Sequence, residues 1–252
     1  MAANQKKMFS SEYPGRIIII GRDPSDRFNV IVYAITGRSP SSQARKLEME
    51  GDSLWIKPTN RETIQKGNVD LLVYPALFAV EQGIAVSNGK QTVDIMASLG
   101  HSRNASEVLA FSLQKWEYEP DRPNYTPRIS GCVLPSGSAA LHIVKREAAG
   151  SVERHLFEFP LTKGKGRMIS TYSGINTDPL PSFQGVPLKV DINAPDGRQI
   201  AEDVYHALSS EQPEKDFRVS VACLTAAFDH DGPHEVAIIN RIEREKNHGK
   251  TG

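Results

Sequence analysis

Short apolar runs broken by turn residues dominate the chain, and they predict strands that pair with their sequence neighbours. The first two runs, Arg16–Gly21 (RIIIIG) and Phe28–Thr36 (FNVIVYAIT), are rich in β-branched residues and flank the turn formers Pro24–Asp26, a pattern typical of a hairpin. Further strands are predicted, in chain order, at Lys46–Glu50, Ser53–Lys57, Val69–Ala79, Gly83–Ser87, Ile129–Leu134, Ala139–Lys145, His155–Phe159, Met168–Tyr172, Phe217–Phe228 and Glu235–Ile242.

Helical periodicity is limited to three places. Val93–Leu99 has one apolar face, a second helix is predicted from Val108 to about Trp116, and a short third one covers Ile200–Leu208. The Pro-rich stretch 174–198 predicts mostly loop. Neighbouring hairpins with helices grouped mid-chain predict an α+β fold with mostly antiparallel sheets. We expect a single domain over 1–252, with loose tails at 1–12 and 243–252.

Composition narrows the classes of function. The 252 residues carry 30 basic and 30 acidic side chains, and 39% are hydrophobic, which argues against a disordered chain and against nucleic-acid binding through bulk charge. No apolar run is long enough for a membrane span or a signal peptide. Cys132 and Cys223 lack a CxxC spacing and fit small core residues in a reducing compartment. The expected location is therefore the cytoplasm.

Polar residues gather where the predicted strands begin or end. They form five segments, Tyr13–Arg16, Thr36–Arg45, Tyr74-Pro75, Ser87–Thr92 and Tyr118–Arg128. Arginine in such loops suits phosphate, because its planar guanidinium forms two parallel hydrogen bonds. Taken singly, each segment also has an ordinary explanation, such as a solvated arginine or an Asn-Gly turn.

Taken together, these segments resemble the archaeal-type inosine monophosphate (IMP) cyclohydrolase family, which also has bacterial members. The matching segments are YPGR at 13–16, TGRSPSSQAR at 36–45, Tyr74, SNGKQT at 87–92, YEPDRPNYTPRI at 118–129, ISTY at 169–172 and AAFDHDG at 226–232. The resemblance implies a four-layer αββα sandwich like that of the N-terminal-nucleophile (Ntn) hydrolases. It also implies closure of 5-formamidoimidazole-4-carboxamide ribonucleotide (FAICAR) to IMP and water, the last step of de novo purine synthesis.

The resemblance also implies roles for individual residues. Tyr74 and Glu119 are candidates for proton transfer, and Arg38, Arg45 and Asn88 are candidates to hold the developing negative oxygen. Either Gln43 or Arg45 fills the family's second basic position. The candidates for substrate binding are Arg16, Ser39, Gly89, Lys90, Gln91, Thr92, Asp121, Asn124, Thr126 and Arg128. The reaction requires no cofactor and no metal, and its partner is a small purine nucleotide.

Alternatives remain open at this stage. The chain is also compatible with a nucleotide-binding homologue that lacks catalysis, and with an Ntn-type amidohydrolase, although it starts Met-Ala-Ala-Asn rather than with a nucleophile. Asp229–His234 crowds four potential ligands, which we interpret as a polar turn rather than a metal site. His142 fits a core residue. A homo-oligomer is compatible with the neutral charge and the predicted edge strands.

Overall fold

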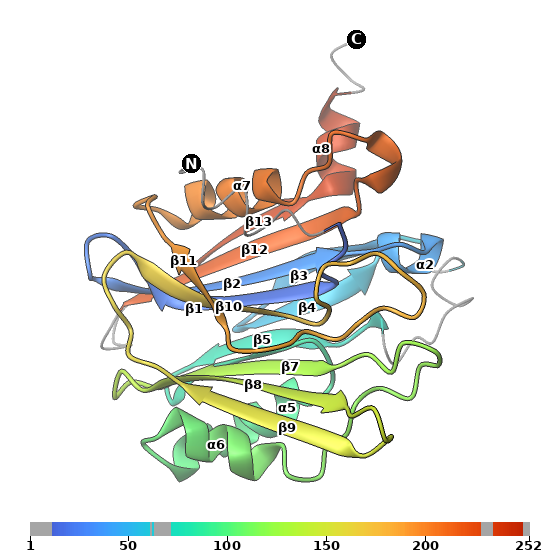
Figure 1. Ribbon diagram of the computed structural model, residues 1–252. Helices are drawn as coiled ribbons and strands as arrows, with labels where there is room; N and C mark the ends of the chain where they lie inside the picture. Colours follow the sequence, from blue (N-terminus) through green and yellow to red (C-terminus); the bar gives the residue numbers. More distant parts are fainter. Residues whose placement is uncertain (1–11, 61, 63–71, 228–233, 249–252) are drawn as a thin grey trace.

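The strands form two antiparallel sheets in the computed structural model, which describes residues 12–60, 62, 72–227 and 234–248 (Figure 1). Within these residues the first sheet has the order β11-β10-β1-β2-β12-β13, and the second has the order β3-β4-β5-β6-β7-β8-β9. The first sheet contains β1 Arg16–Arg22, β2 Phe28–Thr36, β10 Lys165–Ser170, β11 Leu188–Asp191, β12 Arg218–Ala227 and β13 Glu235–Asn240. The second contains β3 Arg45–Glu50, β4 Ser53–Pro58, β5 Pro75–Val80, β6 Gly83–Ser87, β7 Arg128–Val133, β8 Ala139–Arg146 and β9 Val152–Glu158.

The continuous apolar run of β1 follows from burial on both faces. Ile18 and Ile20 pack between the two sheets, whereas Ile17 and Ile19 pack on the outer face of the first sheet. Successive side chains of a strand point to opposite faces, so a strand covered on both sides has no polar alternation. The predicted hairpin is confirmed, because β1 pairs antiparallel with β2 over its whole length.

Helices cover the outer face of each sheet, which gives the expected αββα layer order (Figure 1). On the first sheet lies α7 Gly197–Ala207, followed after β13 by α8 Arg241–His248; on the second lie α5 Thr92–Ser98, a 3-10 turn Leu99–His101 and α6 Ala105–Ser112. Two short helical pieces, α2 Pro40–Gln43 and a 3-10 turn Pro213–Lys215, lie in connections. None of the helices in the described residues has the length and apolar character needed to cross a bilayer.

Several element boundaries differ from the sequence prediction. Helix α6 stops at Ser112 rather than near Trp116, whose indole Nε1 donates to Asp94 Oδ2 at 2.7 Å and lies outside the helix. The strand predicted over Val69–Ala79 begins only at Pro75, and residues 69–71 lie outside the described part. Strand β11 and helix α2 were not predicted either. Strand β11 has four residues within a Pro-rich stretch, and α2 has four residues after the Ser39 cap. Both elements are too short to show a periodic pattern in the sequence.

The end of the chain also differs from the prediction of a loose tail from Glu243. Helix α8 extends to His248, and Arg241 Nε donates to Glu245 Oε1 one turn later at 2.7 Å. Arg244 forms an ion pair with Glu202 of α7 and lies 4.8 Å above the ring of Tyr205. The charged composition that suggested a solvated tail therefore forms contacts between two helices.

The side-chain amide of Asn240 joins the edges of the two sheets. Asn240, at the end of β13, accepts a hydrogen bond from the Leu47 backbone N–H at 2.9 Å and donates to the Leu47 carbonyl at 3.0 Å. Its Oδ1 also accepts from Ser220 Oγ at 2.7 Å. Both backbone groups of Leu47 are thus satisfied from the other sheet, and Asn240 itself is buried.

We expect Asn240→Ala to lower the free energy of unfolding by about 2–4 kcal/mol, because two backbone groups would be left buried without partners. The comparison variant is Asn193→Ala, which removes an exposed amide from a loop and should change stability by less than about 0.5 kcal/mol. Urea unfolding measures both. Equal stability of the two variants would show that the amide bridge contributes nothing.

Candidate active site

The polar segments identified in the sequence meet at one end of both sheets. In the first sheet the start of β1, the end of β2 and the end of β10 lie together, because these strands are antiparallel neighbours. In the second sheet the same alternation joins the starts of β3, β5 and β7 with the end of β6. Segments separated by more than 100 positions in the chain are thereby neighbours in space.

Two cations and two phenols lie between the sheets at this end. Arg16 and Tyr33 point inward from the first sheet, and Arg45 and Tyr74 enter from the second; all four are buried. The hydroxyls of Tyr33 and Tyr74 are 2.9 Å apart and form a hydrogen bond across the two sheets. Burial, together with the neighbouring Tyr74, raises the pKa of Tyr33 well above its usual value, so this phenol stays protonated.

The guanidinium of Arg45 is a buried cation, and two of its nitrogens lack a hydrogen-bond acceptor among the described residues. Only 2% of the residue is exposed, and its Nε donates to the Ser42 carbonyl at 2.8 Å. In the described part of the chain, Nη1 and Nη2 have no hydrogen-bond partner. Burial and the nearby charge of Arg16 lower the pKa of Arg45 to about 10. Two free donors beside a second cation favour an anionic or strongly polar ligand group.

Glu119 supplies the carboxylate of the cluster. It is 2% exposed, and its Oε1 lies 3.5 Å from Arg128 Nη1. Burial raises the pKa of Glu119 to about 7, against the opposing attraction of Arg16 and Arg128. A carboxyl group that titrates near neutral pH both accepts and donates a proton under physiological conditions, which suits acid–base catalysis.

A cavity of about 300 Å³ opens onto this cluster. Its inner part includes Arg16 and Glu119, and its rim carries Arg38 and the hydroxyls of Ser39 and Ser41. The full lining is Tyr13, Arg16, Arg38, Ser39, Ser41, Leu72, Glu119, Asp121, Asn124, Thr126, Tyr172 and Leu180. The cavity therefore runs from a polar, open rim to a buried pair of opposite charges.

One wall of the cavity is fixed by contacts of the 118–127 segment. Asp121 accepts from the Thr126 N–H at 2.6 Å and from Thr126 Oγ1 at 2.5 Å, and the latter lies 2.6 Å from the Tyr172 hydroxyl. Asn124 Oδ1 accepts from the Leu180 N–H at 3.0 Å. Burial raises the pKa of Tyr172 to about 12. These contacts join the wall to the segment that follows β10.

Arg38 lies on the facing wall of the cavity and holds it through contacts with two other segments. Its guanidinium lies 5.2 Å from the ring centre of Tyr13, which in turn stacks on Tyr172 at 5.8 Å. Arg38 Nη1 also donates to Asn176 Oδ1 and to the Thr177 carbonyl, both at 3.1 Å. Arg38 thus ties the connection after β2 to the segment after β10 while remaining at the cavity rim.

The SNGKQT segment lies behind the cavity and contacts it through Arg128. Gln91 Oε1 accepts from Arg128 Nη1 at 3.0 Å, and a Cβ on Gly89 would lie 2.7 Å from that nitrogen, so Gly89 leaves room for the guanidinium. Asn88 Nδ2 donates to the Pro127 carbonyl, and its Oδ1 accepts from the Ile129 N–H, both at 2.8 Å. The amides of Gly89, Thr92 and Val93 already donate within the segment.

The structure thus divides the residues expected from the sequence, apart from Lys90, into three groups. Arg16, Arg38, Ser39, Glu119, Asp121, Asn124 and Thr126 line the cavity. Tyr74 and Arg45 are buried beside it, close enough to interact electrostatically with Arg16. Asn88, Gly89, Gln91, Thr92 and Arg128 form the layer behind it, and Lys90 is exposed on the surface. Gln43 donates to the Gly37 carbonyl at 3.1 Å, whereas Arg45 is the buried basic residue.

Three tyrosines of the site were not among the predicted site residues. Tyr33 is the only residue of FNVIVYAIT with a phenol, which marked it as unusual in an aliphatic strand. Tyr13 and Tyr172 stand inside the matching segments YPGR and ISTY, and position within a motif was the signal available for them.

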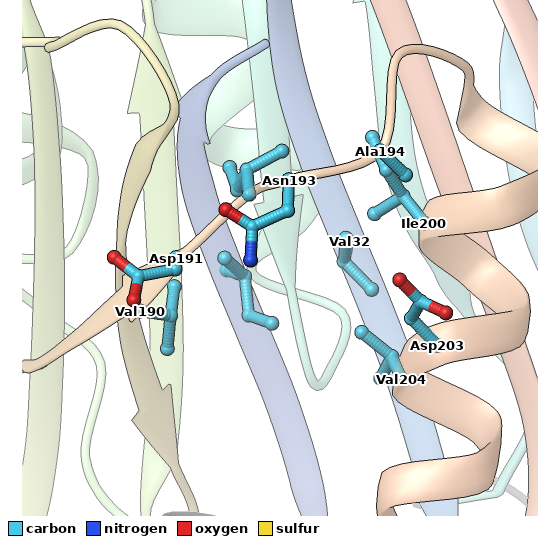
Figure 2. A pocket seen from close by; sticks show the side chains of 10 residues that line it. Val32, Val190, Asp191, Asn193, Ala194, Ile200, Asp203 and Val204 are labelled. Atoms are coloured by element: carbon cyan, nitrogen blue, oxygen red, sulfur yellow. The ribbon is translucent and has the colours of Figure 1, made fainter. Parts of the chain in front are cut away.

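Other parts of the molecule fit an active site less well. The hollow in Figure 2, between α7 and the segment 190–194, is mostly apolar and holds about 30 Å³, the volume of about one water. His142 is buried, and burial lowers its pKa to about 4. Cys132 and Cys223 are buried and free. Within the described residues no three His, Cys, Asp or Glu side chains group as metal ligands, and Asp229–Pro233 of the predicted polar turn lie outside them.

Known proteins match this chain over the whole region that contains the cavity. A family model described as IMP cyclohydrolase-like protein matches residues 13–232. The chain is also 26% identical over 228 residues to a protein named IMP cyclohydrolase from Methanothrix thermoacetophila, an alignment that covers 90% of this chain and 98% of that protein. The matched region includes the cavity and every cluster residue described above.

Proposed function

The chain belongs to the IMP cyclohydrolase-like protein family, and from this membership and the geometry of the cavity we propose that it closes the purine ring of FAICAR to give IMP and water. One observation carries the proposal: Arg16 and Glu119, whose carboxyl group has a pKa near 7, lie at the inner end of one cavity, and Arg45 and the Tyr33–Tyr74 pair are buried beside it. Such a reaction would complete de novo purine synthesis.

The rate of this reaction depends more on how the substrate is held than on the strength of the nucleophile. The carboxamide nitrogen of FAICAR attacks the carbon of its own formyl group, a C–N bond forms, and the formyl oxygen becomes negative. This oxygen takes up two protons and leaves as water, while the attacking nitrogen loses one proton and the formamido nitrogen loses the other as the C=N bond forms. Because the attack is intramolecular, holding the reactive conformer supplies much of the acceleration.

Glu119 and Tyr74 are the groups we assign to proton transfer. As a carboxylate, Glu119 takes a proton from the attacking nitrogen, and as a carboxylic acid it returns a proton to the departing oxygen. A pKa of about 7 suits both steps. A hydrogen bond between the Tyr33 and Tyr74 hydroxyls, 2.9 Å apart, holds the hydroxyl of Tyr74 in place.

The buried arginines supply positive charge for the oxygen that becomes negative. Arg16 lies in the cavity next to Glu119, and Arg45 presents two unfilled donors behind it. Donors held in a dry site act strongly on developing charge, because no water has to reorganise. The 5′-phosphate is a hydrated dianion, and the open rim with Arg38, Ser39 and Ser41 is the part of the cavity that suits it.

The pH dependence of FAICAR turnover tests this assignment. We expect kcat/KM to fall tenfold per pH unit below about 7, because the carboxylate form of Glu119 in the free enzyme starts the reaction. In Glu119→Gln the remaining activity should lose this inflection. A flat profile in the wild-type protein between pH 5 and 8 would exclude Glu119 as the base.

A nucleotide-binding role without catalysis is the second candidate from the sequence. It requires the cations and the cavity, but it gives no reason for a carboxyl group that is 2% exposed and titrates near neutrality beside them. The enzymatic role accounts for both.

A further inference from the structure

A second cavity, of about 250 Å³, lies at the opposite end of the first sheet. Its floor is apolar and includes Ile20, Phe159 and Leu161, and its walls carry Lys165, Arg167 and Lys189. Strand β1 runs from Arg16 in the first cavity to Gly21 in this one, so five residues of extended strand, about 16 Å, separate them. The two cavities share no lining residue.

The register shows that these basic residues face the space between the sheets. Arg167 is directly opposite Ile20 on β1, and Ile20 belongs to the core between the sheets. Arg167 is also directly opposite Lys189 on β11. Directly opposed residues point to the same face, and like charges in such a pair destabilise a sheet. The inner face of the first sheet, which is apolar in its middle at Ile18 and Ile20, therefore becomes cationic at this end.

The positive charge of this cavity is only partly balanced by the described residues. In the part of the chain that the structure describes, neither Arg167 nor Lys189 has an ion-pair or hydrogen-bond partner. Lys165 does pair with Asp191 Oδ1 at 2.7 Å, and Lys163 adds an exposed cation in the adjoining loop. The chain as a whole has a net charge of zero, so the excess of positive charge is local to this cavity.

We propose that this cavity binds a small phosphomonoester with an apolar or aromatic group. The guanidinium of Arg167 and the ammonium of Lys189 match the charge of a phosphate dianion and offer several donors to its oxygens. The floor of Ile20, Phe159 and Leu161 covers the apolar part of such a ligand. The cavity volume restricts the ligand to a small one.

Phenyl phosphate is the probe for this site, and isothermal titration calorimetry measures its binding to the full-length protein. We expect measurable binding that weakens at least tenfold in the double variant Arg167→Gln/Lys189→Gln. The charge-matched double variant Lys115→Gln/Lys246→Gln removes two exposed cations elsewhere and should bind within twofold of wild type. Arg16→Gln, which alters the first cavity, should also leave this binding unchanged.

Three results would overturn the proposal. The first is wild-type binding by Arg167→Gln/Lys189→Gln, with circular dichroism showing a folded protein. The second is loss of binding in Arg16→Gln, which would place phenyl phosphate in the first cavity. The third is equally tight binding of inorganic phosphate, which would show that the cavity attracts anions through its charge and does not recognise the aromatic group. Because the single variant Lys189→Gln alters only an exposed side chain, it provides a folded protein for the same titration.

Discussion

Glu119→Gln is expected to lower kcat for FAICAR about 10²–10⁴-fold while changing KM much less, because a proton transfer contributes mainly in the transition state. Gln keeps the shape of the side chain but neither takes nor releases a proton at this site. Tyr74→Phe should have an effect of similar kind, since it removes the hydroxyl that Tyr33 holds at 2.9 Å. Steady-state kinetics of the two single variants and the double variant measure this.

The double variant gives the sharper result. If Tyr74 and Glu119 serve one proton-transfer sequence, the combined loss is much smaller than the product of the single losses. Matched controls are Glu214→Gln, an exposed carboxylate, and Tyr205→Phe, on α7 of the outer layer. Both controls should turn over substrate within about twofold of wild type. Near-normal kcat in the single variants Tyr74→Phe and Glu119→Gln would contradict the assignment and shift it to the arginines.

Arg45→Met is expected to make the protein more stable and less active. In the substrate-free protein, Arg45 is a buried cation with two unfilled donors and a cationic neighbour, so its charge costs free energy. Met keeps an unbranched apolar stem, is shorter than Arg and carries no charge, and the free energy of unfolding should rise by about 1–3 kcal/mol. Losing a charged hydrogen bond to the reacting oxygen should lower kcat/KM by about 10- to 200-fold, equivalent to about 1.5–3 kcal/mol.

The variant Arg45→Lys separates charge from geometry. It keeps a cation at the site but loses the planar fork, so it should lower kcat/KM without the gain in stability. Urea unfolding and FAICAR kinetics of the two variants provide the comparison. If Arg45→Met is destabilised and active, Arg45 is a structural residue.

The clustering of the polar segments at one end of the sheets could be predicted from the sequence, because strand ends are visible in it. Each polar segment follows or precedes an apolar run, and antiparallel pairing places alternate ends of successive strands at the same edge. YPGR, the start of β3, Tyr74 and the segment before β7 therefore meet, although no local pattern says which of their side chains point inward. Hairpins and helix periodicity predicted an α+β fold with mostly antiparallel sheets, whereas the αββα layer order was expected only from the resemblance to the family.

Contacts between the sheets could not be predicted. The hydrogen bond between Tyr33 and Tyr74, and the Asn240 amide that satisfies Leu47, both depend on how one sheet lies on the other. The sequence shows only a tyrosine in an apolar strand and an asparagine at the end of another. The near-neutral pKa of Glu119 has the same origin, since burial between loops from distant segments raises it.

Short elements were missed for a different reason. Strand β11 has four residues and is defined by its pairing with β10 rather than by its own pattern. Helix α8 is highly charged, and its i,i+4 pair Arg241–Glu245 and its contact with Glu202 of α7 account for its order. Tertiary contacts override composition in both cases.

Turnover of FAICAR by the purified wild-type protein tests the central proposal most directly. Chromatography would follow the conversion of FAICAR to IMP with the protein, with Glu119→Gln and in buffer alone. The proposal predicts stoichiometric formation of IMP by the wild-type protein, far faster than in buffer, and a rate at least about 10²-fold lower with Glu119→Gln. Binding of FAICAR by the wild-type protein with no IMP formed beyond the rate in buffer would contradict it, and would make the chain a nucleotide-binding member of its family.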